Sequence, residues 1–367
     1  MENISFYLYL FNYVLFIILA WPFIPVYIGS IKNRNGKESG RVFLYAFILL
    51  VLCVFGYSDW DFSSYYLIYE ECKRGVEGGL EPIYIWLISY TDNYFIWRLI
   101  IWGLATYLMI VTIRRLPVRL NCVLLFITLF YILSFYKLRN VLGFSLLYLG
   151  ATIILYHNKK KHKATIFGWC LIFASFFCHR SMLLTILVCF VGALISLNKT
   201  KASILLLMWP IFTIAMTIVL KIIVSGGVDN ELEQIDAVGK ATRYAGGEKG
   251  EVNINGLIKL LLDNTAYLSC FYLLTKELIY NKLSCPKIIS FYYNIWFIFT
   301  YIGYALFFQE ASKWLSIRVL TMGYFPMAVV LGWYYSYQKR TCYQRIILCI
   351  SGLYYLFSVS YILYKGL

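Results

Sequence analysis

Apolar stretches about as long as a bilayer is thick recur along the whole chain. Two examples are residues 94–113, "YFIWRLIIWGLATYLMIVTI", and residues 202–220, "ASILLLMWPIFTIAMTIVL". A helix needs roughly 20 consecutive apolar residues to cross the hydrocarbon core of a membrane. Charged residues make up only 14% of the 367-residue chain, whereas an average soluble domain carries about 25%. The pattern therefore predicts an all-α polytopic membrane protein.

The hydropathy pattern predicts about twelve membrane-spanning helices in a single integral membrane domain, residues 1–367. The segment 82–90, "PIYIWLISY", is too short to cross and is expected to lie along the membrane interface. The expected spans are residues 5–29, 42–57, 94–113, 120–135, 141–156, 164–178, 181–197, 202–224, 257–275, 288–308, 319–337 and 346–363.

Lysine and arginine are distributed unequally between the two sides of the predicted membrane. One set of loops holds 19 Lys/Arg and two acids, and the rest of the chain holds 14 Lys/Arg and 16 acids. The positive-inside rule makes the first set cytoplasmic. The net charge of +15 is then mostly topogenic, and no nucleic-acid motif accompanies it. The cytoplasmic loops are residues 32–41, 114–119, 157–163, 199–201, 276–287 and 339–345.

Cations on the opposite, outer side need another explanation. Lys137 and Arg139 lie between two long apolar runs, and no Asp or Glu occurs between residues 93 and 228. A lone cation at a membrane is costly to desolvate and normally has an anionic partner. The full set of outer-side candidates is Arg98, Lys137, Arg139, Arg180, Lys221, Arg243, Lys313 and Arg318.

Two sizeable outer loops, residues 58–93 and 225–256, are expected to complete a site around these cations. The first contains the acids Asp59, Asp61 and Glu81 together with interfacial helices, and the second is a possible lid. Cations and carboxylates at one membrane face suggest a cavity that binds a charged headgroup and performs acid–base chemistry.

Three segments resemble signatures of the EpsG family. "SDWDFSSYYLIYE" followed by "EPIYIWL" resembles the Asp-aromatic-x-x-Tyr and Glu-Pro-x-Tyr signatures of its first external loop. "FYKLRNVLGFS" resembles its Leu-Arg-Gln segment, with Asn140 where Gln is usual, and "FFCHRSMLL" resembles its His-Pro-Ser motif, with Arg180 in place of Pro. The match runs in order over about residues 40 to 190, followed by weaker echoes in "RYAGG" and "RVLTMGYF".

The resemblance implies a bacterial inner-membrane enzyme similar to Wzy polymerases of capsule, exopolysaccharide and O-antigen synthesis. Such an enzyme has a GT-C-like fold, uses neither metal nor other cofactor, and joins repeat units carried on undecaprenyl pyrophosphate at the outer face. The implied partners are the lipid-linked oligosaccharide, membrane lipids, and the chain-length regulator and flippase of the same pathway.

Roles for individual residues follow from that implied chemistry. Arg139, with Lys137, is expected to bind the pyrophosphate, because a guanidinium pairs two phosphate oxygens at once. An acid of the first external loop, Asp61 or Glu81, is expected to act as base toward the acceptor hydroxyl. The substrate-binding candidates are Tyr65, Lys137, His179, Arg180, Arg243 and Arg318.

Each candidate also has a structural interpretation that the sequence leaves open. Arg139 and Lys137 would snorkel to lipid headgroups, and Asp61 would cap a helix through 62–74. Glu81 would pair with Arg74 or Lys73 across a turn. The remaining alternatives are a carbonyl partner for His179, a loop-end cap for Arg180, a solvated charge at Arg243, an interface anchor at Arg318 and a disulfide between Cys72 and Cys178.

Three other functions compete with polymerisation. A lipid-linked oligosaccharide flippase would use the same cations but needs a path through both leaflets, whereas the unexplained charges gather on one side. An O-antigen ligase shares the donor chemistry and differs only in its acceptor. A sugar acyltransferase would need an early catalytic histidine, and none precedes His157.

Overall fold

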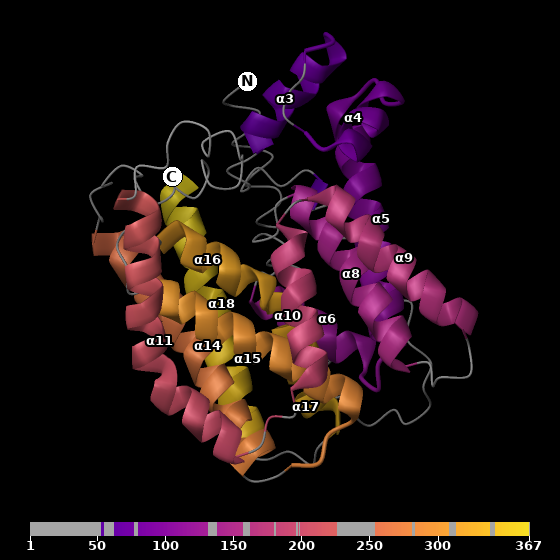
Figure 1. Cartoon of the computed structure of the whole chain (residues 1–367). Helices are drawn as coiled ribbons and strands as arrows, with labels where there is room; N and C mark the ends of the chain where they lie inside the picture. The colour runs from indigo at the N-terminus through magenta and orange to yellow at the C-terminus, as the bar shows by residue number, and fades with distance from the viewer. Residues whose placement is uncertain are drawn as a thin grey trace. The chain divides into compact units, whose positions relative to one another are not determined.

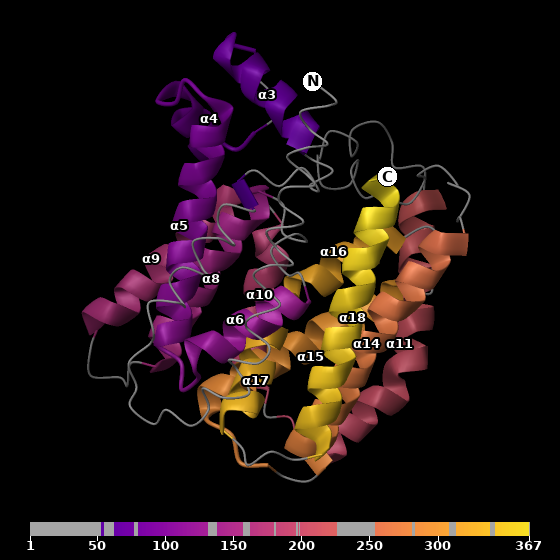
Figure 2. The same cartoon turned by 180° about the vertical axis from the view of Figure 1, so that it is seen from behind.

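The structure is a computed structural model in which residues 53–54, 62–76, 80–130, 138–156, 162–179, 181–195, 197, 199–225, 254–280, 283–307, 313–337 and 342–366 are described. Over these residues the chain is entirely helical, with thirteen α-helices and one π-helix and no strand (Figures 1 and 2). The all-α prediction is confirmed for this part of the chain. The expected span 5–29 and nearly all of 42–57 lie outside the described residues.

The helices follow the expected spans closely, because each apolar run continues until a charged or turn-forming residue interrupts it. Their bounds are α3 Phe62–Lys73, α4 Pro82–Ser89, α5 Tyr94–Arg114, α6 Leu120–Leu129, α8 Leu138–Tyr156, α9 His162–Cys178, α10 Met182–Leu194, α11 Lys199–Ser225, α14 Ile254–Thr275, the π-helix η1 Lys276–Tyr280, α15 Lys287–Phe307, α16 Lys313–Met322, α17 Tyr324–Tyr337 and α18 Cys342–Gly366.

Two of the described helices are individually long and apolar enough to cross a membrane, Tyr94–Arg114 and Leu138–Leu155. A third candidate is a bent pair, Ser316–Met322 followed by Tyr324–Ser336, with an angle of 42° between its halves. The expected span at 319–337 is therefore divided into two helices in the described structure. Gly323 separates the two helices, and its backbone packs so closely that an added Cβ would lie 3.1 Å from the Phe299 side chain.

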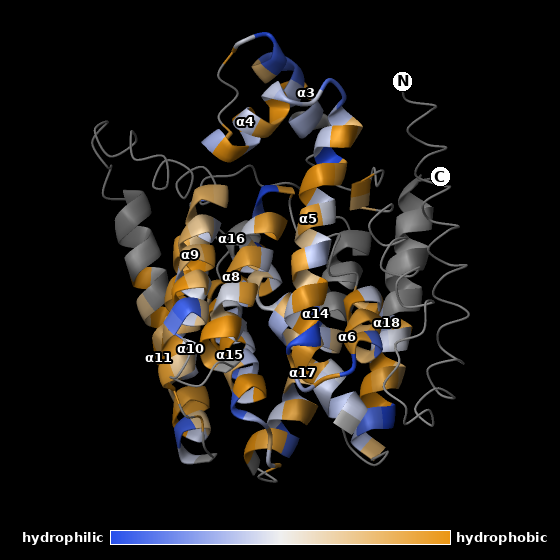
Figure 3. Cartoon of the chain, turned by 90° about the vertical axis from the view of Figure 1, so that its right-hand side faces the viewer, coloured by the Kyte–Doolittle hydropathy of each residue, from blue (hydrophilic) through white to orange (hydrophobic). Residues whose placement is uncertain are grey.

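Large apolar side chains are exposed on the faces of several helices, and the hydropathy colouring of Figure 3 shows hydrophobic residues along many of the described helices. In water such faces would be costly, whereas lipid tails are themselves apolar. Together with the apolar helices, these faces identify the chain as a membrane protein. Examples are Ile96, Leu99 and Leu104 on α5, Phe167, Trp169 and Phe173 on α9, Leu187 and Phe190 on α10, and Leu207, Ile211 and Ile214 on α11.

The described helices divide into two compact units. One takes the helices up to Leu187 and those from Ala328 onward, and the other is Val188–Met327. In the second unit α15 packs against α11 and α16, and the Tyr267 hydroxyl accepts a hydrogen bond from Trp296 Nε1 at 2.8 Å. The first unit contains α3, α4, α5, α8 and α9, which carry the candidate site described below.

Helices α8 and α9 run antiparallel and touch through their backbones at a pair of glycines. A Cβ added at Gly150 would lie 2.6 Å from the carbonyl oxygen of Gly168, and one added at Gly168 would lie 2.9 Å from that of Gly150. Nearer the start of α8, a Cβ at Gly143 would lie 2.8 Å from the Met182 sulfur. Small residues allow this close approach, which is common where membrane helices pack.

This glycine contact determines how far along the two helices Arg139 and His179 lie. Arg139 precedes Gly150 by eleven residues, and His179 follows Gly168 by eleven. Eleven residues correspond to about 16 Å and three full helical turns plus about 20°. Arg139 therefore lies on the same face of α8 as Gly150, level with the end of α9 where His179 follows.

We expect Gly150→Ala to destabilise the protein by about 1–3 kcal/mol, because the new methyl group collides with backbone that has no side chain to move aside. The matched control is Gly103→Ala on α5, where an added Cβ has nothing within 4 Å and alanine favours the helix. Thermal unfolding of the purified protein in detergent measures both. An equal melting temperature for the two variants would contradict the close crossing.

Candidate functional site

Three side chains from distant parts of the chain meet at one end of the α8–α9 pair. The Glu81 carboxylate places Oε1 2.7 Å from His179 Nδ1 and Oε2 3.4 Å from a terminal nitrogen of Arg139. The Glu81 side chain is 15% exposed, and those of Arg139 and His179 are 23% exposed. One carboxylate thus lies between two basic groups in a half-buried setting.

The start of α4 sets the position of Glu81. Glu81 is the N-cap residue with an extended backbone, Pro82 follows at the first helical position, and the Glu81 carbonyl accepts from Tyr84 N–H at 2.9 Å. Proline suits this position because its missing N–H would be unpaired there. The Glu81 side chain makes no capping bond, so its carboxylate is free to meet groups outside the helix.

Tyr84 attaches this helix start to α8. Its buried hydroxyl donates to the backbone carbonyl of Arg139 at 2.7 Å. Glu81 and Tyr84 are three residues apart and hence on one side of the helix. The Glu-Pro-x-Tyr pattern therefore supplies both a carboxylate and an anchor directed at the same residue of α8.

Tyr65 on α3 holds the other side of the Arg139 guanidinium. The Tyr65 hydroxyl accepts from Arg139 Nε at 3.0 Å, and the guanidinium carbon lies 5.6 Å from the centre of the Tyr65 ring. That distance is within the range of a cation–π contact. Tyr65, a predicted substrate-binding residue, thus lies in direct contact with Arg139.

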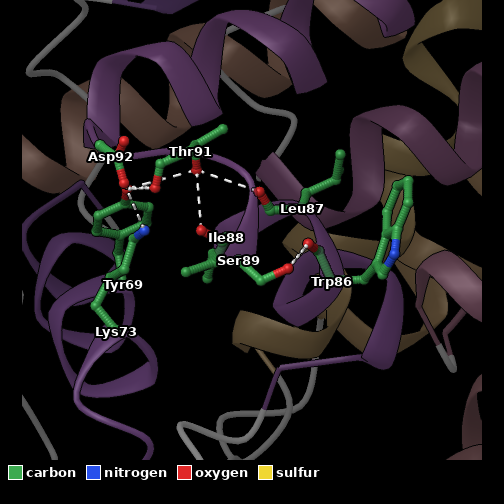
Figure 4. A network of polar contacts seen from close by, with 8 residues as sticks. All are labelled: Tyr69, Lys73, Trp86, Leu87, Ile88, Ser89, Thr91 and Asp92. Carbon is green, nitrogen blue, oxygen red and sulfur yellow. Dashed lines mark hydrogen bonds and ion pairs between the residues drawn. The ribbon is translucent and has the colours of Figure 1, made fainter.

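A polar network ties α3 to the turn between α4 and α5 (Figure 4). One α-helical turn after Tyr65, the Tyr69 hydroxyl donates to the Thr91 carbonyl at 2.7 Å, and Thr91 Oγ1 donates back to the carbonyls of Leu87 and Ile88. Asn93 then caps α5 by accepting from Phe95 N–H at 2.8 Å. The network fixes the helix that carries Tyr65 against the one that carries Glu81.

Lys73 is not the partner of Glu81. It forms an ion pair of 3.1 Å with the exposed Asp92, and such a surface pair contributes little to stability. The turn pairing of Glu81 with Lys73 is therefore wrong, because the loop folds so that Lys73 faces the α4–α5 turn (Figure 4). In the described residues, Glu81 instead pairs with Arg139 and His179.

The electrostatics of Glu81 follow from these partners. Burial acts to raise the pKa of this carboxyl, but the hydrogen bond with His179 and the positive charge of Arg139 outweigh it and hold the pKa below its ordinary value. Glu81 is then ionised at neutral pH. It supplies the anion that Arg139 lacks along the acid-free stretch 93–228.

Arg98 corrects a further expectation. Its side chain is 1% exposed, and it donates to the carbonyls of Cys53 and Val54 at 2.8 and 3.0 Å and to the Tyr94 hydroxyl at 3.1 Å. Arg98 therefore binds backbone of the preceding segment and does not project toward a headgroup. Burying a guanidinium is costly unless its donors find acceptors, and these oxygens supply them.

The other sequence candidates are not joined to this cluster by the described structure. Asp61, Lys137, Arg180 and Arg243 lie outside the described residues. Arg318 lies on α16 in the second unit, half-buried, and its carbonyl accepts from Thr321 Oγ1. Cys72 and Cys178 are free cysteines, so the disulfide between them is absent. Among the described residues, no three His, Cys, Asp or Glu side chains gather into a group that would hold a metal ion.

A family model for the EpsG family matches residues 41–366. The chain belongs to the EpsG family. This is a family of Wzy-like polysaccharide polymerases, so at the family level the activity is polymerisation of a polysaccharide by a membrane protein. Searches of curated proteins and of solved structures each gave no match.

Two buried oxygens beside the site of this EpsG-family chain were not identified from the sequence. Asn140 Oδ1 and Ser181 Oγ are both shielded from solvent and have no hydrogen-bond partner among the described residues. Leaving a buried oxygen unpaired costs about 1–3 kcal/mol. Asn140 follows Arg139 directly and Ser181 is two residues after His179, so two unpaired buried oxygens lie next in sequence to the basic residues of the site.

We expect Glu81→Gln to lower the free energy of unfolding at neutral pH by about 1–3 kcal/mol, because it removes a charge-assisted contact to two basic groups. A carboxyl whose pKa is lowered by folding contributes stability above its ordinary pKa and loses it as pH falls through the lowered value. The difference from wild type should therefore shrink at acid pH. The matched control is Glu71→Gln on the exposed side of α3.

Thermal unfolding in detergent at a series of pH values measures this difference. The control should match wild type throughout. A Glu81→Gln deficit that is absent at neutral pH, or that stays constant down to acid pH, would contradict an ionised Glu81 paired with Arg139 and His179.

Proposed function

We propose that this chain polymerises polysaccharide repeat units at the outer face of a bacterial inner membrane. It transfers the growing glycan from undecaprenyl pyrophosphate onto the non-reducing end of the next lipid-linked repeat unit, without a metal ion. Membership of the EpsG family supports the polymerase class. The charge distribution, which makes the opposite loops cytoplasmic, supports the outer face.

The observation that carries the proposal is the Glu81–Arg139–His179 cluster at one end of two apolar helices. The 3.4 Å separation of Glu81 and Arg139 is longer than the roughly 2.7–2.9 Å typical of a tight charge-assisted bond. Glu81 therefore holds Arg139 near the site loosely, and a pyrophosphate with two or more charges competes well for it. The outer-loop origin of Tyr65 and Glu81 supports a site that opens to the outer leaflet.

Arg139 stabilises the leaving group in this mechanism. Negative charge develops on the pyrophosphate as the bond to the sugar breaks, and a positioned guanidinium meets that charge with a planar pair of donors. Removing such a contact costs about 2–4 kcal/mol in the barrier. Lys137, two residues before Arg139 in the sequence, contributes a second positive charge toward the pyrophosphate. Asp61 contributes a second acid from the outer loop.

Arg139→Ala should stop chain extension, with a fall of about 100-fold or more in rate, while single lipid-linked repeat units accumulate. Arg139→Lys should recover only a small part, since an ammonium cannot form the planar two-oxygen contact. The control is Arg115→Ala, which removes an exposed cation at the C-terminal end of α5. Gel analysis of glycan length in cells is the measurement, and a normal length distribution in Arg139→Ala excludes Arg139 from the mechanism.

Chain extension should persist when divalent metal ions are removed, because side chains rather than a metal meet the pyrophosphate charge. Membranes containing the chain are treated with a chelator, washed, and supplied with the lipid-linked repeat unit extracted from cells that lack the chain. Unchanged extension is the expected result. A strict requirement for added magnesium or manganese would overturn the metal-free part of the proposal.

A further inference from the structure

The contact between Glu81 and His179 determines which ring nitrogen of the imidazole is already engaged and which is not. Nδ1 lies 2.7 Å from Glu81 Oε1, and an ionised carboxylate only accepts hydrogen bonds. Nδ1 therefore carries the hydrogen, and in the neutral ring Nε2 keeps a lone pair. Among the residues that the structure describes, the imidazole has no second hydrogen-bond partner, and its side chain is 23% exposed.

We infer that His179, through Nε2, is the base that accepts the proton of the acceptor sugar hydroxyl, and that Glu81 is the positioning residue that holds the ring. This assignment rests on the proposed function and deepens it. It moves the proton transfer from an acid of the external loop to an imidazole carried between two apolar helices. The arrangement matches the general logic of a base oriented by a third group.

Glu81 is poorly suited to be the base itself. Both of its oxygens already accept, one from His179 and one from Arg139. The pKa of the Glu81 carboxyl is held below its ordinary value by those two partners, which weakens it as a proton acceptor. An imidazole is the side chain whose basicity is best matched to neutral pH.

The acceptor hydroxyl gives its proton to His179 Nε2 as its oxygen forms a bond to the anomeric carbon of the donor sugar. The bond between that carbon and the pyrophosphate oxygen breaks, and its electron pair leaves on the pyrophosphate beside Arg139. The imidazolium, still bonded to Glu81 through Nδ1, later releases the proton to water.

The surroundings of His179 suit a sugar rather than an apolar ligand. Ser181 Oγ and Asn140 Oδ1 are buried oxygens without partners in the described part of the chain. The second turn of α8 packs against the end of α9 and the start of α10 here, since a Cβ at Gly143 would meet Met182 and Cys178. These oxygens lie within two residues of Arg139 and His179 in the sequence and make the surroundings polar.

The test uses membranes that contain the full chain and, as substrate, the lipid-linked repeat unit extracted from cells that lack it. Four variants are compared with wild type: His179→Ala, His179→Asn, Arg139→Ala and the control His162→Asn at the exposed start of α9. His179→Asn keeps an N–H for Glu81 but has no base, so it separates folding from catalysis. Thermal unfolding is measured beside chain extension.

We expect both His179 variants to extend glycans at least about 100-fold more slowly than wild type, with His179→Asn unfolding near the wild-type temperature. Added imidazole should restore at least a tenth of the lost rate to His179→Ala and nothing to Arg139→Ala. Across a series of methyl-substituted imidazoles, the restored rate should rise with the basicity of the additive, which a merely structural role would not produce.

Two results would overturn the assignment while the proposed function stands. The first is extension at the wild-type rate by either His179 variant. The second is an inactive, normally folded His179→Ala that no imidazole restores, which indicates binding rather than proton transfer. Failure of wild-type membranes to extend the repeat unit would instead overturn the proposed function itself.

Discussion

The candidate site depends on the backbone contact between Gly150 and Gly168. These two glycines let α8 and α9 approach until carbonyl oxygens nearly touch the opposite backbone, and Arg139 and His179 lie at equal distances from them along the two helices. A slip of one residue along either helix shifts a side chain by about 1.5 Å and rotates it by about 100°. Arg139 and His179 are therefore aligned by a contact between the two helices that lies about three turns away from them.

Charge is balanced across this unit by a residue from outside the apolar helices. Arg139 and His179 belong to a long stretch without a single acid, and the compensating carboxylate comes from the loop before α5. Glu81 reaches them because Pro82 starts α4 at the right place and Tyr84 attaches that helix to α8. The same half-burial that makes an isolated charge expensive makes these contacts effective once they form.

The sequence predicted helices well and contacts poorly, for physical reasons. The run at 94–113 became Tyr94–Arg114 because apolar length alone determines a membrane helix. The break at Gly323, where the backbone packs closely against Phe299, could not be predicted from hydropathy. Glu81, Arg139, Tyr65 and His179 were all selected as candidates, but the partners of Glu81 lie 58 and 98 residues away. Arg98 was misjudged because only packing decides whether its donors meet solvent or carbonyls.

The bond from Tyr84 has a consequence beyond holding α4 in place. It is made to the backbone carbonyl of residue 139 and not to the guanidinium, so this one anchor of the outer loop does not depend on the side chain at position 139, whereas the contacts of Glu81 and Tyr65 do. At residue 139 the backbone therefore attaches α4, and the side chain contacts Glu81 and Tyr65. A substitution at position 139 can thus remove the side-chain contacts to Glu81 and Tyr65 while the Tyr84 bond still joins α4 to α8.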